Sequence, residues 1–556
     1  MIDLADCRKK YPWLYKDAFL LYLVCFLMFG KRLLLLDYQI NPEEGKELLQ
    51  ALDILKGKII YRDFFSQYGP GGSYFTALLY KLTGDANLIL PRLAVSVLAT
   101  FTAYYSYRIA RFFLSPGWAF WAALLSCSGL ASRESAYGHA FAFLGMIGSL
   151  YFLLSYFNKD RNAWKLLIAG FFVLLALLSK PVAFGIGAVL TGIFCIGLGS
   201  TLYGEKGELK PRLWLFLSPC IFPSLIVYGT LFVLTPLETF AFSFNPVNAG
   251  NQPTEGYFLK PLLPPLPYFP IGNWIADLNF YLVDPLRYWI VVLTFTGGFL
   301  FLLYSLICKW KCKAANLSLI ILLAYSLLID IETLILIRRS VTHYINMLPG
   351  FIMLAMFFSV LKPLRKMRWP VNAAAVGMCA FYFFYPAIKI GWHYALNGVP
   401  LELKYVESIQ ATPYQAKSYQ NTVQYIRENS PADRPILFVG FGSLIYLASE
   451  RSMIFPEQYS IFARTTIFEY LQKSEFYDAP FPRRVDQMIV DRIHSKKPSL
   501  LLIPSHYMKR NRLDSSVFIQ HIDKEWVLKD TLNAGLARGP FDWEEWELQA
   551  WIPLTT

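Results

Sequence analysis

Long apolar runs dominate residues 1–400, and short charged segments separate them. A helix that crosses a bilayer needs roughly 20 mainly apolar residues. Eleven runs approach that length and are predicted transmembrane helices: 17–36, 88–112, 117–132, 140–157, 164–179, 181–199, 213–235, 286–307, 316–336, 343–361 and 370–391. Lys180 and Pro181 interrupt the stretch 164–199, which predicts a tight helical hairpin.

Residues 401–556 follow the pattern of an ordinary globular protein. Residues 436–439 and 500–503 are strand-like, whereas 415–429 and 483–494 are helical. The chain is 55% hydrophobic and 16% charged, well below the quarter or so that is typical of soluble proteins. The fold class predicted is therefore an α-helical polytopic membrane protein, with about 11 transmembrane helices in residues 1–400 and a soluble α/β domain in 401–556.

The basic residues define the orientation of these helices. With a cytoplasmic N-terminus, every loop on the cytoplasmic side is basic, as the positive-inside rule requires. These loops hold Arg108/Arg111, Lys159/Arg161/Lys165, Lys206/Lys210/Arg212, Lys309/Lys311/Lys313 and Lys362/Arg365/Lys366/Arg368. An odd number of helices then places 401–556 outside, as expected in a bacterial inner (plasma) membrane. The basic residues behind the net charge of +13 lie mainly in these loops, so this charge does not indicate nucleic-acid binding.

Two outer loops are unusual. In the first, residues 37–87, Pro42, Glu43 and Glu44 have the form of a helix start, and an amphipathic helix at the membrane surface is expected after them. The second, residues 236–285, contains nine prolines, which exclude regular helix and central strand. A loop of that length in a compact protein is functional or disordered.

Polar groups at membrane depth are costly, so their positions are informative. In this topology most of them fall at the outer ends of the helices: Asp37, Glu43, Glu44, Arg133, Glu134, His139, Lys180, Asp330, Glu332, Arg338, Arg339 and His343. A carboxylate can deprotonate an attacking hydroxyl, and cations can neutralise a departing phosphate. The pattern predicts an outer-leaflet site for transfer from a phosphate-linked lipid donor.

Three groups of residues carry a resemblance to a known family. They are Asn41 to Gly45 with Tyr61-Arg62-Asp63-Phe64-Phe65 and Gly69-Pro70-Gly71, then Leu178-Ser179-Lys180-Pro181, and Arg338-Arg339-Ser340-Val341-Thr342-His343-Tyr344 followed by Leu348-Pro349-Gly350. The first group closely resembles the first outer loop of GT-C glycosyltransferases. These are polyprenyl-phosphate-sugar-dependent enzymes related to protein mannosyltransferases and the aminoarabinose transferase of lipid A.

The resemblance implies roles for particular residues. An acid after the first helix, usually aspartate in an Asp-Glu pair, is the catalytic base. Here Glu43 stands at that position and Glu44 matches the second acid, while Asp37 and Asp63 are alternatives. The residues expected to bind the donor phosphate are Arg338, Arg339, Lys180, His343, Tyr344 and Arg62. A divalent metal ion is left open, because some relatives need one and others do not.

Each of these residues also has a structural interpretation. Acids stabilise the first turn of any helix, Asp37 marks a membrane exit, and Asp63 can pair with Arg62. The reaction expected is inverting transfer of a sugar from a polyprenyl-phosphate donor to a lipid, glycan or protein acceptor. A transporter or flippase of a lipid-linked glycan and a non-catalytic membrane scaffold are the alternatives.

Overall fold

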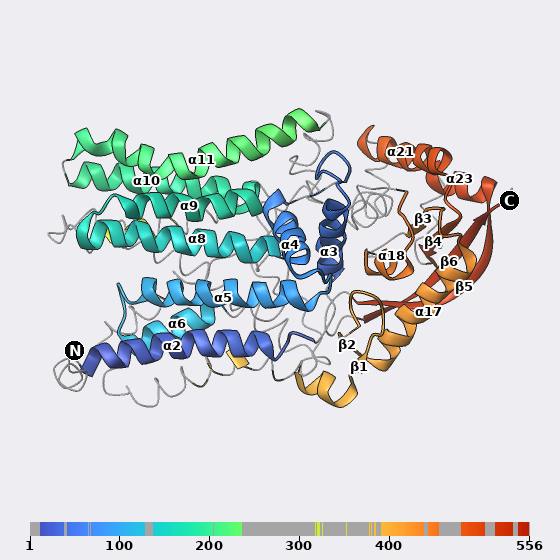
Figure 1. The fold of residues 1–556 in the computed structure, drawn as a ribbon, viewed down its shortest axis with the longest axis horizontal. Coiled ribbons are helices and arrows are strands. Elements are labelled where there is room, and N and C mark those ends of the chain that lie inside the picture. The colour runs from blue at the N-terminus through green and yellow to red at the C-terminus, as the bar shows by residue number, and fades with distance from the viewer. Residues whose placement is uncertain are drawn as a thin grey trace, which may run out of the picture.

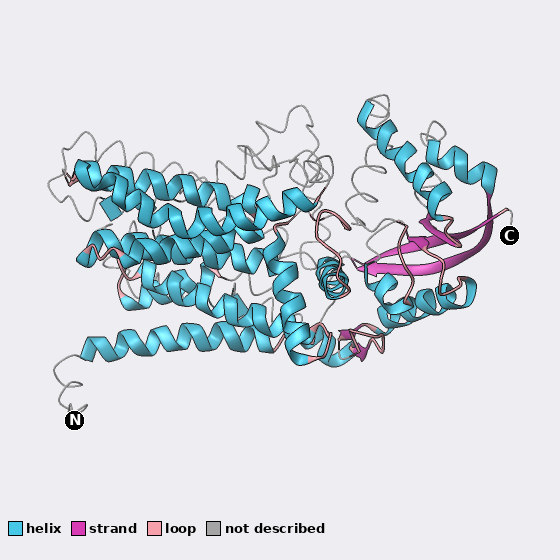
Figure 2. Cartoon of the chain, turned by 45° about the horizontal axis from the view of Figure 1, so that its top comes forward, coloured by secondary structure: helices cyan, strands magenta, loops and turns pink. Residues whose placement is uncertain are grey.

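The computed structural model describes most of the chain. The described residues are 12–37, 42–127 without 65 and 67, 137–235 without 204, 391–454 without 408 and 439–442, 480–505, 517–537 and 543–554, together with single residues between 317 and 388. Helices run side by side through one half of the molecule and a mixed sheet with helices occupies the other (Figure 1). A view turned by 45° shows the same division, with the strands confined to the C-terminal half (Figure 2).

The helical half corresponds to the first seven predicted membrane helices. It contains α2 (Pro12–Leu33), α5 (Ile89–Ala110), α6 (Pro116–Ser126), α8 (Tyr137–Ser155), α9 (Trp164–Ser179), α10 (Ile186–Leu202) and α11 (Leu209–Leu234). Within the described ranges, Gly138–Asn158 and Leu209–Leu234 are long and apolar enough to cross a membrane, and α9 and α10 are shorter apolar helices. The other four predicted helices, between residues 286 and 391, fall largely outside the described residues, so the total of eleven stays a prediction.

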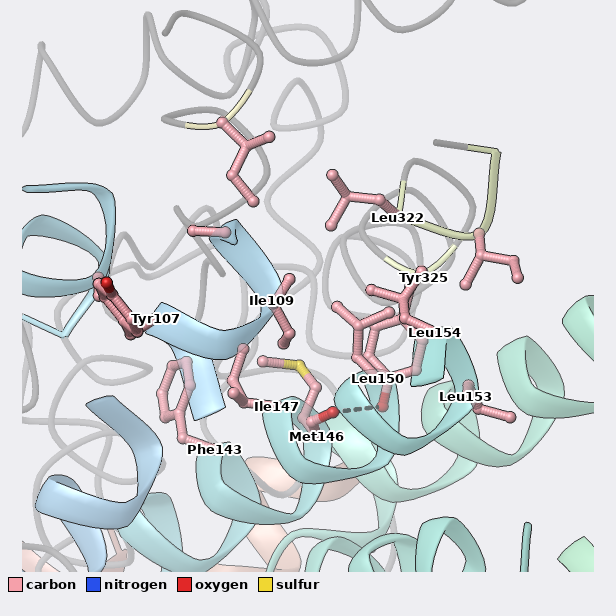
Figure 3. Packing of buried hydrophobic residues seen from close by; sticks show 14 of the residues in the cluster. Tyr107, Ile109, Phe143, Met146, Ile147, Leu150, Leu153, Leu154, Leu322 and Tyr325 are labelled. Carbon is pink, nitrogen blue, oxygen red and sulfur yellow. Dashed lines mark hydrogen bonds between the residues drawn. The ribbon is translucent and has the colours of Figure 1, made fainter. Parts of the chain in front are cut away.

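An apolar cluster fills the space between these helices. Residues of α2, α5, α6 and α8–α11 form it, and many of their side chains are fully buried. Tyr325 joins the cluster from a distant part of the chain, and its hydroxyl donates a hydrogen bond of 2.8 Å to the carbonyl oxygen of Met146 (Figure 3). This hydrogen bond joins Tyr325 to α8.

The predicted hairpin is present and turns at Lys180. The residue before a proline is disfavoured in the α conformation, and Lys180 has φ −137° and ψ 77°. A short π-helical turn, η2 (Pro181–Gly185), follows and folds back against α9. Gly185 permits this approach, because a Cβ there would lie 2.8 Å from the Cα of Leu177. The hairpin thus places Lys180 at one end of the helical half.

The C-terminal half has the predicted α/β character. Its elements are β1 (Val399–Pro400), β2 (Gln410–Ala411), α17 (Pro413–Asn429), β3 (Ile436–Phe438), α18 (Ser443–Ser449), α21 (Pro480–Lys496), β4 (Leu500–Pro504), α23 (Val517–Glu525), β5 (Trp526–Ala537) and β6 (Trp543–Pro553). The main sheet has the order β3-β4-β6-β5, with β3 and β4 parallel and the other pairs antiparallel. The two predicted strands and two predicted helices are confirmed, whereas the β5–β6 hairpin was not expected.

The first outer loop forms two helices between the halves, α3 (Pro42–Leu55) and α4 (Pro70–Thr83) (Figure 1). The C-terminal half packs on α3, and the expected position of this helix at the membrane surface stays a prediction. Leu48 and Ala51 share one apolar cluster with residues of the C-terminal sheet and α17. On the same face as Leu48, a Cβ at Gly45 would meet Leu444 of α18 at 2.6 Å. The helix is covered because the C-terminal half packs onto it, which a single helix's periodicity does not reveal.

Candidate functional site

Three side chains, those of Lys46, His139 and Lys180, lie around the ring of Tyr68. We call these four residues the Tyr68 cluster. The Nζ atom of Lys180 lies 4.6 Å from the centre of the Tyr68 ring, and Nζ of Lys46 lies 4.4 Å from it. The His139 ring meets Tyr68 edge to face at 5.8 Å, and its Nε2 atom is 2.5 Å from Nζ of Lys180. Lys46, His139 and Lys180 are all buried.

The electrostatic character of this cluster is basic. An ammonium group is attracted to the face of an aromatic ring by the ring quadrupole. Two ammonium groups on one ring, with an imidazole beside them, still concentrate positive charge in a small volume from which water is largely excluded. A site of that kind favours an anion with several acceptor oxygens, such as a phosphate.

Close backbone contact between two of the sequence motifs positions the cluster. The N–H of Gly69 donates a hydrogen bond of 2.8 Å to the carbonyl oxygen of Ser179. A Cβ at Gly69 would lie 2.2 Å from the carbonyl oxygen of Leu178, and one at Gly71 would lie 3.0 Å from it. The Gly-Pro-Gly segment of the first loop therefore docks directly on the turn that carries Lys180.

Further hydrogen bonds orient the loop on the hairpin. The Tyr61 hydroxyl donates to the carbonyl oxygen of Tyr68 at 2.7 Å. The Tyr228 hydroxyl of α11 donates to the carbonyl oxygen of Leu177 at 2.7 Å. Because both hydroxyl groups donate to backbone carbonyl oxygens, they fix the position of the loop relative to the hairpin.

Glu44 takes part in a buried ion pair. Its Oε2 and Oε1 atoms accept hydrogen bonds from Nη2 and Nε of Arg92 at 2.6 and 2.9 Å. Nη1 of Arg92 donates to the carbonyl oxygen of Leu36 at 2.7 Å. Both side chains are buried, so this bidentate pair ties α3 to α5 and to the end of the first helical segment. The geometry gives Glu44 a structural role.

Asp63 and Arg62 pair with each other near the surface, as the structural interpretation of Asp63 expected. Nε and Nη2 of Arg62 donate to the Asp63 carboxylate at 3.0 and 2.7 Å. The Arg62 guanidinium lowers the pKa of the Asp63 carboxyl, and the backbone N–H of Ile59 acts in the same direction. A carboxylate held in its ionised form by these donors is a weaker proton acceptor.

Asp37 connects the two halves through its backbone. Its carbonyl oxygen accepts a hydrogen bond of 2.6 Å from the N–H of Gln410, next to the small β1–β2 sheet. Glu43 lies in the first turn of α3, and its side chain is outside the part of the chain that the structure describes. The same holds for Arg338, Arg339, His343 and Tyr344, whose expected roles stay predictions.

Sequence reasoning missed three residues of this region. Lys46 follows Glu43 by three positions, so helical spacing places the two on one face of α3. Arg92 is a charge just inside an otherwise apolar predicted helix, which is a signal in itself. Tyr68 gave no signal beyond its position next to the Gly-Pro-Gly segment.

The fold was compared with known proteins. No family model matches the chain, and no curated protein matches it either. Among solved structures, the apo oligosaccharyltransferase of Archaeoglobus fulgidus is similar over 89% of this chain and 70% of its own length, with a TM-score of 0.52 and 12% identity. ArnT from Cupriavidus metallidurans, bound to undecaprenyl phosphate, is similar over 97% of this chain and 98% of its own length, with a TM-score of 0.50 and 13% identity.

These likenesses define the fold. The chain shares its fold with this oligosaccharyltransferase and with ArnT, in agreement with the resemblance in its first outer loop. The match to ArnT extends over nearly all of both chains, so it includes the C-terminal half as well as the helices. At 12–13% identity, the likeness concerns the fold and leaves the reaction to be argued from the site.

Proposed function

We propose that this protein is an inverting GT-C glycosyltransferase that moves a sugar from a polyprenyl-phosphate donor to a lipid, glycan or protein acceptor on the extracytoplasmic side. The Tyr68 cluster carries the proposal. It places Lys46, His139 and Lys180 around one ring, at the junction of the first outer loop and the hairpin turn. The undecaprenyl phosphate held by the ArnT structure is a carrier of the class proposed here.

The cluster would bind the donor phosphate and stabilise it as it leaves. When the bond from the anomeric carbon to the phosphate oxygen breaks, negative charge grows on the phosphate. Buried cations aimed at that charge act more strongly than they would in water, because the surrounding dielectric constant is low. Arg338, Arg339, His343 and Tyr344 are proposed to complete this binding site. The polyprenyl tail would lie among the helices and the membrane lipids.

Glu43 is the proposed catalytic base. Both oxygens of Glu44 accept from Arg92, and Asp63 is held by Arg62, which favours Glu43 over these two acids. Asp37 stays an alternative. Glu43 stands about one helical turn before Lys46 in α3, and this spacing supports a base close to a phosphate-binding cation.

The reaction balances as a single displacement. The acceptor hydroxyl gives its proton to Glu43, and its oxygen bonds to the anomeric carbon from the side opposite the phosphate. The bond between that carbon and the phosphate oxygen breaks, and polyprenyl phosphate leaves with the electron pair. The products are the inverted glycoside, the carrier phosphate and a protonated Glu43.

The test is transfer of radiolabelled sugar in vesicles that hold the purified full chain, with a panel of polyprenyl-phosphate sugars and acceptors. Removing one preorganised donor to a developing anion lowers turnover by about 10²–10³. Lys180→Gln and Lys46→Gln are expected to show losses of that order, while Lys180→Arg retains part of the activity. Lys56→Gln, an exposed lysine after α3, is the matched control.

The same vesicles separate the alternatives. Movement of the labelled lipid across the bilayer without transfer would identify a transporter, and neither movement nor transfer with any donor would favour a scaffold. A chelator in a parallel assay decides whether a divalent metal ion is needed. A reporter fused after residue 400 that is found in the cytosol would refute the proposed sidedness.

A further inference from the structure

A second cluster of side chains lies far along the chain, on two helices of the C-terminal half. His494 is near the end of α21, while His521 and Glu525 are four residues apart on α23 and so share one face of that helix. The two helices pack against each other beside the sheet (Figure 1). This packing brings two imidazoles and one carboxylate together.

The donor atoms have the spacing of a coordination sphere. Nε2 of His494 is 3.3 Å from Nδ1 of His521, and Oε1 of Glu525 is 3.4 Å from Nδ1 of His521. Oε1 of Glu525 lies 3.9 Å from Nε2 of His494. Ligands about 2.0–2.1 Å from a tetrahedral Zn²⁺ are about 3.3–3.4 Å from one another. Two of the three edges therefore fit already, and a half-ångström movement of the exposed Glu525 carboxylate would close the third.

We propose that His494, His521 and Glu525 bind a divalent transition-metal ion, with Zn²⁺ as the ion that fits best. Two imidazoles and a carboxylate are a ligand set that Zn²⁺ accepts, with water in the fourth position. Water can reach that position, because the side chains of His494 and Glu525 are 53% and 54% exposed. The ion binds outside the Tyr68 cluster and outside the proposed transfer chemistry.

Trp526 loses its hydrogen bond to His521 when the ion binds. Its indole N–H donates to Nε2 of His521 at 3.4 Å, beyond the usual range of such bonds. With the ion on Nδ1, Nε2 of His521 carries the ring proton, so this long contact is given up. The loss is small because the contact is weak at that distance.

The ion would join two segments that flank the sheet. α21 leads into β4, and α23 continues directly into β5. A bond from each helix to one ion holds these strand connections together. Since an ion that binds only the folded form stabilises it by mass action, added Zn²⁺ should raise the unfolding temperature of the protein.

The experiment is calorimetric titration of the full chain with Zn²⁺, after purification through a tag without histidine. One bound ion that depends on His494 is expected, and bound Co²⁺ should give the intense visible absorption of tetrahedral coordination. His494→Ala and Glu525→Gln should each weaken binding at least about tenfold. Both side chains are exposed, so these variants are expected to fold, which size-exclusion chromatography checks.

Matched controls make the result specific. Asp523→Asn removes an exposed acid of the same helix that lies outside the cluster, and His393→Ala removes a histidine elsewhere. Both should bind Zn²⁺ as the unaltered protein does. The proposal is overturned if Zn²⁺ shows no saturable binding, if His494→Ala binds it unchanged, or if bound Co²⁺ lacks the tetrahedral absorption.

Discussion

Substitution of Gly69 by alanine tests how closely the first outer loop must approach the hairpin turn. The added Cβ would lie 2.2 Å from the carbonyl oxygen of Leu178 and 2.6 Å from its carbonyl carbon, whereas ordinary contact begins at 3.4 Å. Both atoms belong to backbone, so no side chain can rotate away. The loop and the hairpin must separate by about 1 Å, at a cost of about 1–3 kcal/mol in stability.

That separation should affect transfer more than folding. Tyr68 precedes Gly69, and Lys180 follows Leu178 by two residues, so the movement changes the distances inside the Tyr68 cluster. A misplacement of about 1 Å in a reacting site can cost about 10²-fold in rate. We expect Gly69→Ala to remain folded and to lose transfer activity by about that factor, measured as sugar transfer per mole of folded protein in vesicles.

Two other glycines form a graded control series. At Gly71 the Cβ would be 3.0 Å from the same carbonyl oxygen, so Gly71→Ala should show a smaller loss. At Gly117, in α6, a Cβ would meet nothing within 4 Å, so Gly117→Ala should behave as the unaltered protein. If Gly69→Ala transfers sugar as fast as Gly117→Ala, the loop-to-hairpin contact does not position the site.

Three further predictions concern the acids. Glu44→Gln leaves Arg92 buried without its carboxylate and should lower the free energy of unfolding by about 3–5 kcal/mol, measured by denaturant titration. The double change of Glu44→Leu with Arg92→Leu should cost less stability than either single change. Equal unfolding of Glu44→Gln and the unaltered protein would contradict this prediction. Glu43→Gln should lower transfer about 10²–10⁴-fold without changing the affinity for polyprenyl phosphate, and full activity would remove Glu43 as the base. Asp63→Asn should leave transfer unchanged at neutral pH. Arg62 lowers the pKa of Asp63 in the folded protein. The stability that this pair contributes is therefore fully present above the ordinary aspartate pKa of about 3.9 and is lost as the pH falls below it. Denaturant unfolding at a series of pH values measures this loss.

Predictions based on local pattern succeeded where one kind of local interaction decides the outcome. The hairpin turn at Lys180 follows from the proline after it, and the strand β4 follows from a short apolar run between turns. The β5–β6 hairpin was missed because its strands mix charged and apolar residues. β5 pairs with β6, and β6 also pairs with β4, so distant strand pairing holds the hairpin in the sheet. The packing of the C-terminal half on α3 was not foreseen, because a distant part of the chain supplies those contacts.

The sequence by itself determined the approximate positions of the first seven apolar helices and the lysine at the hairpin turn. Run length, proline and charge act over a few residues, so they can be seen without coordinates. Only the tertiary structure decided that Arg92 forms an ion pair with Glu44, that Lys46 and His139 lie with Lys180 around Tyr68, and that His494 contacts His521. The contacting pairs are 22 to 112 residues apart in sequence, from Lys46 and Tyr68 to Tyr68 and Lys180. Which distant side chains meet depends on how whole helices pack, and no local pattern encodes that choice.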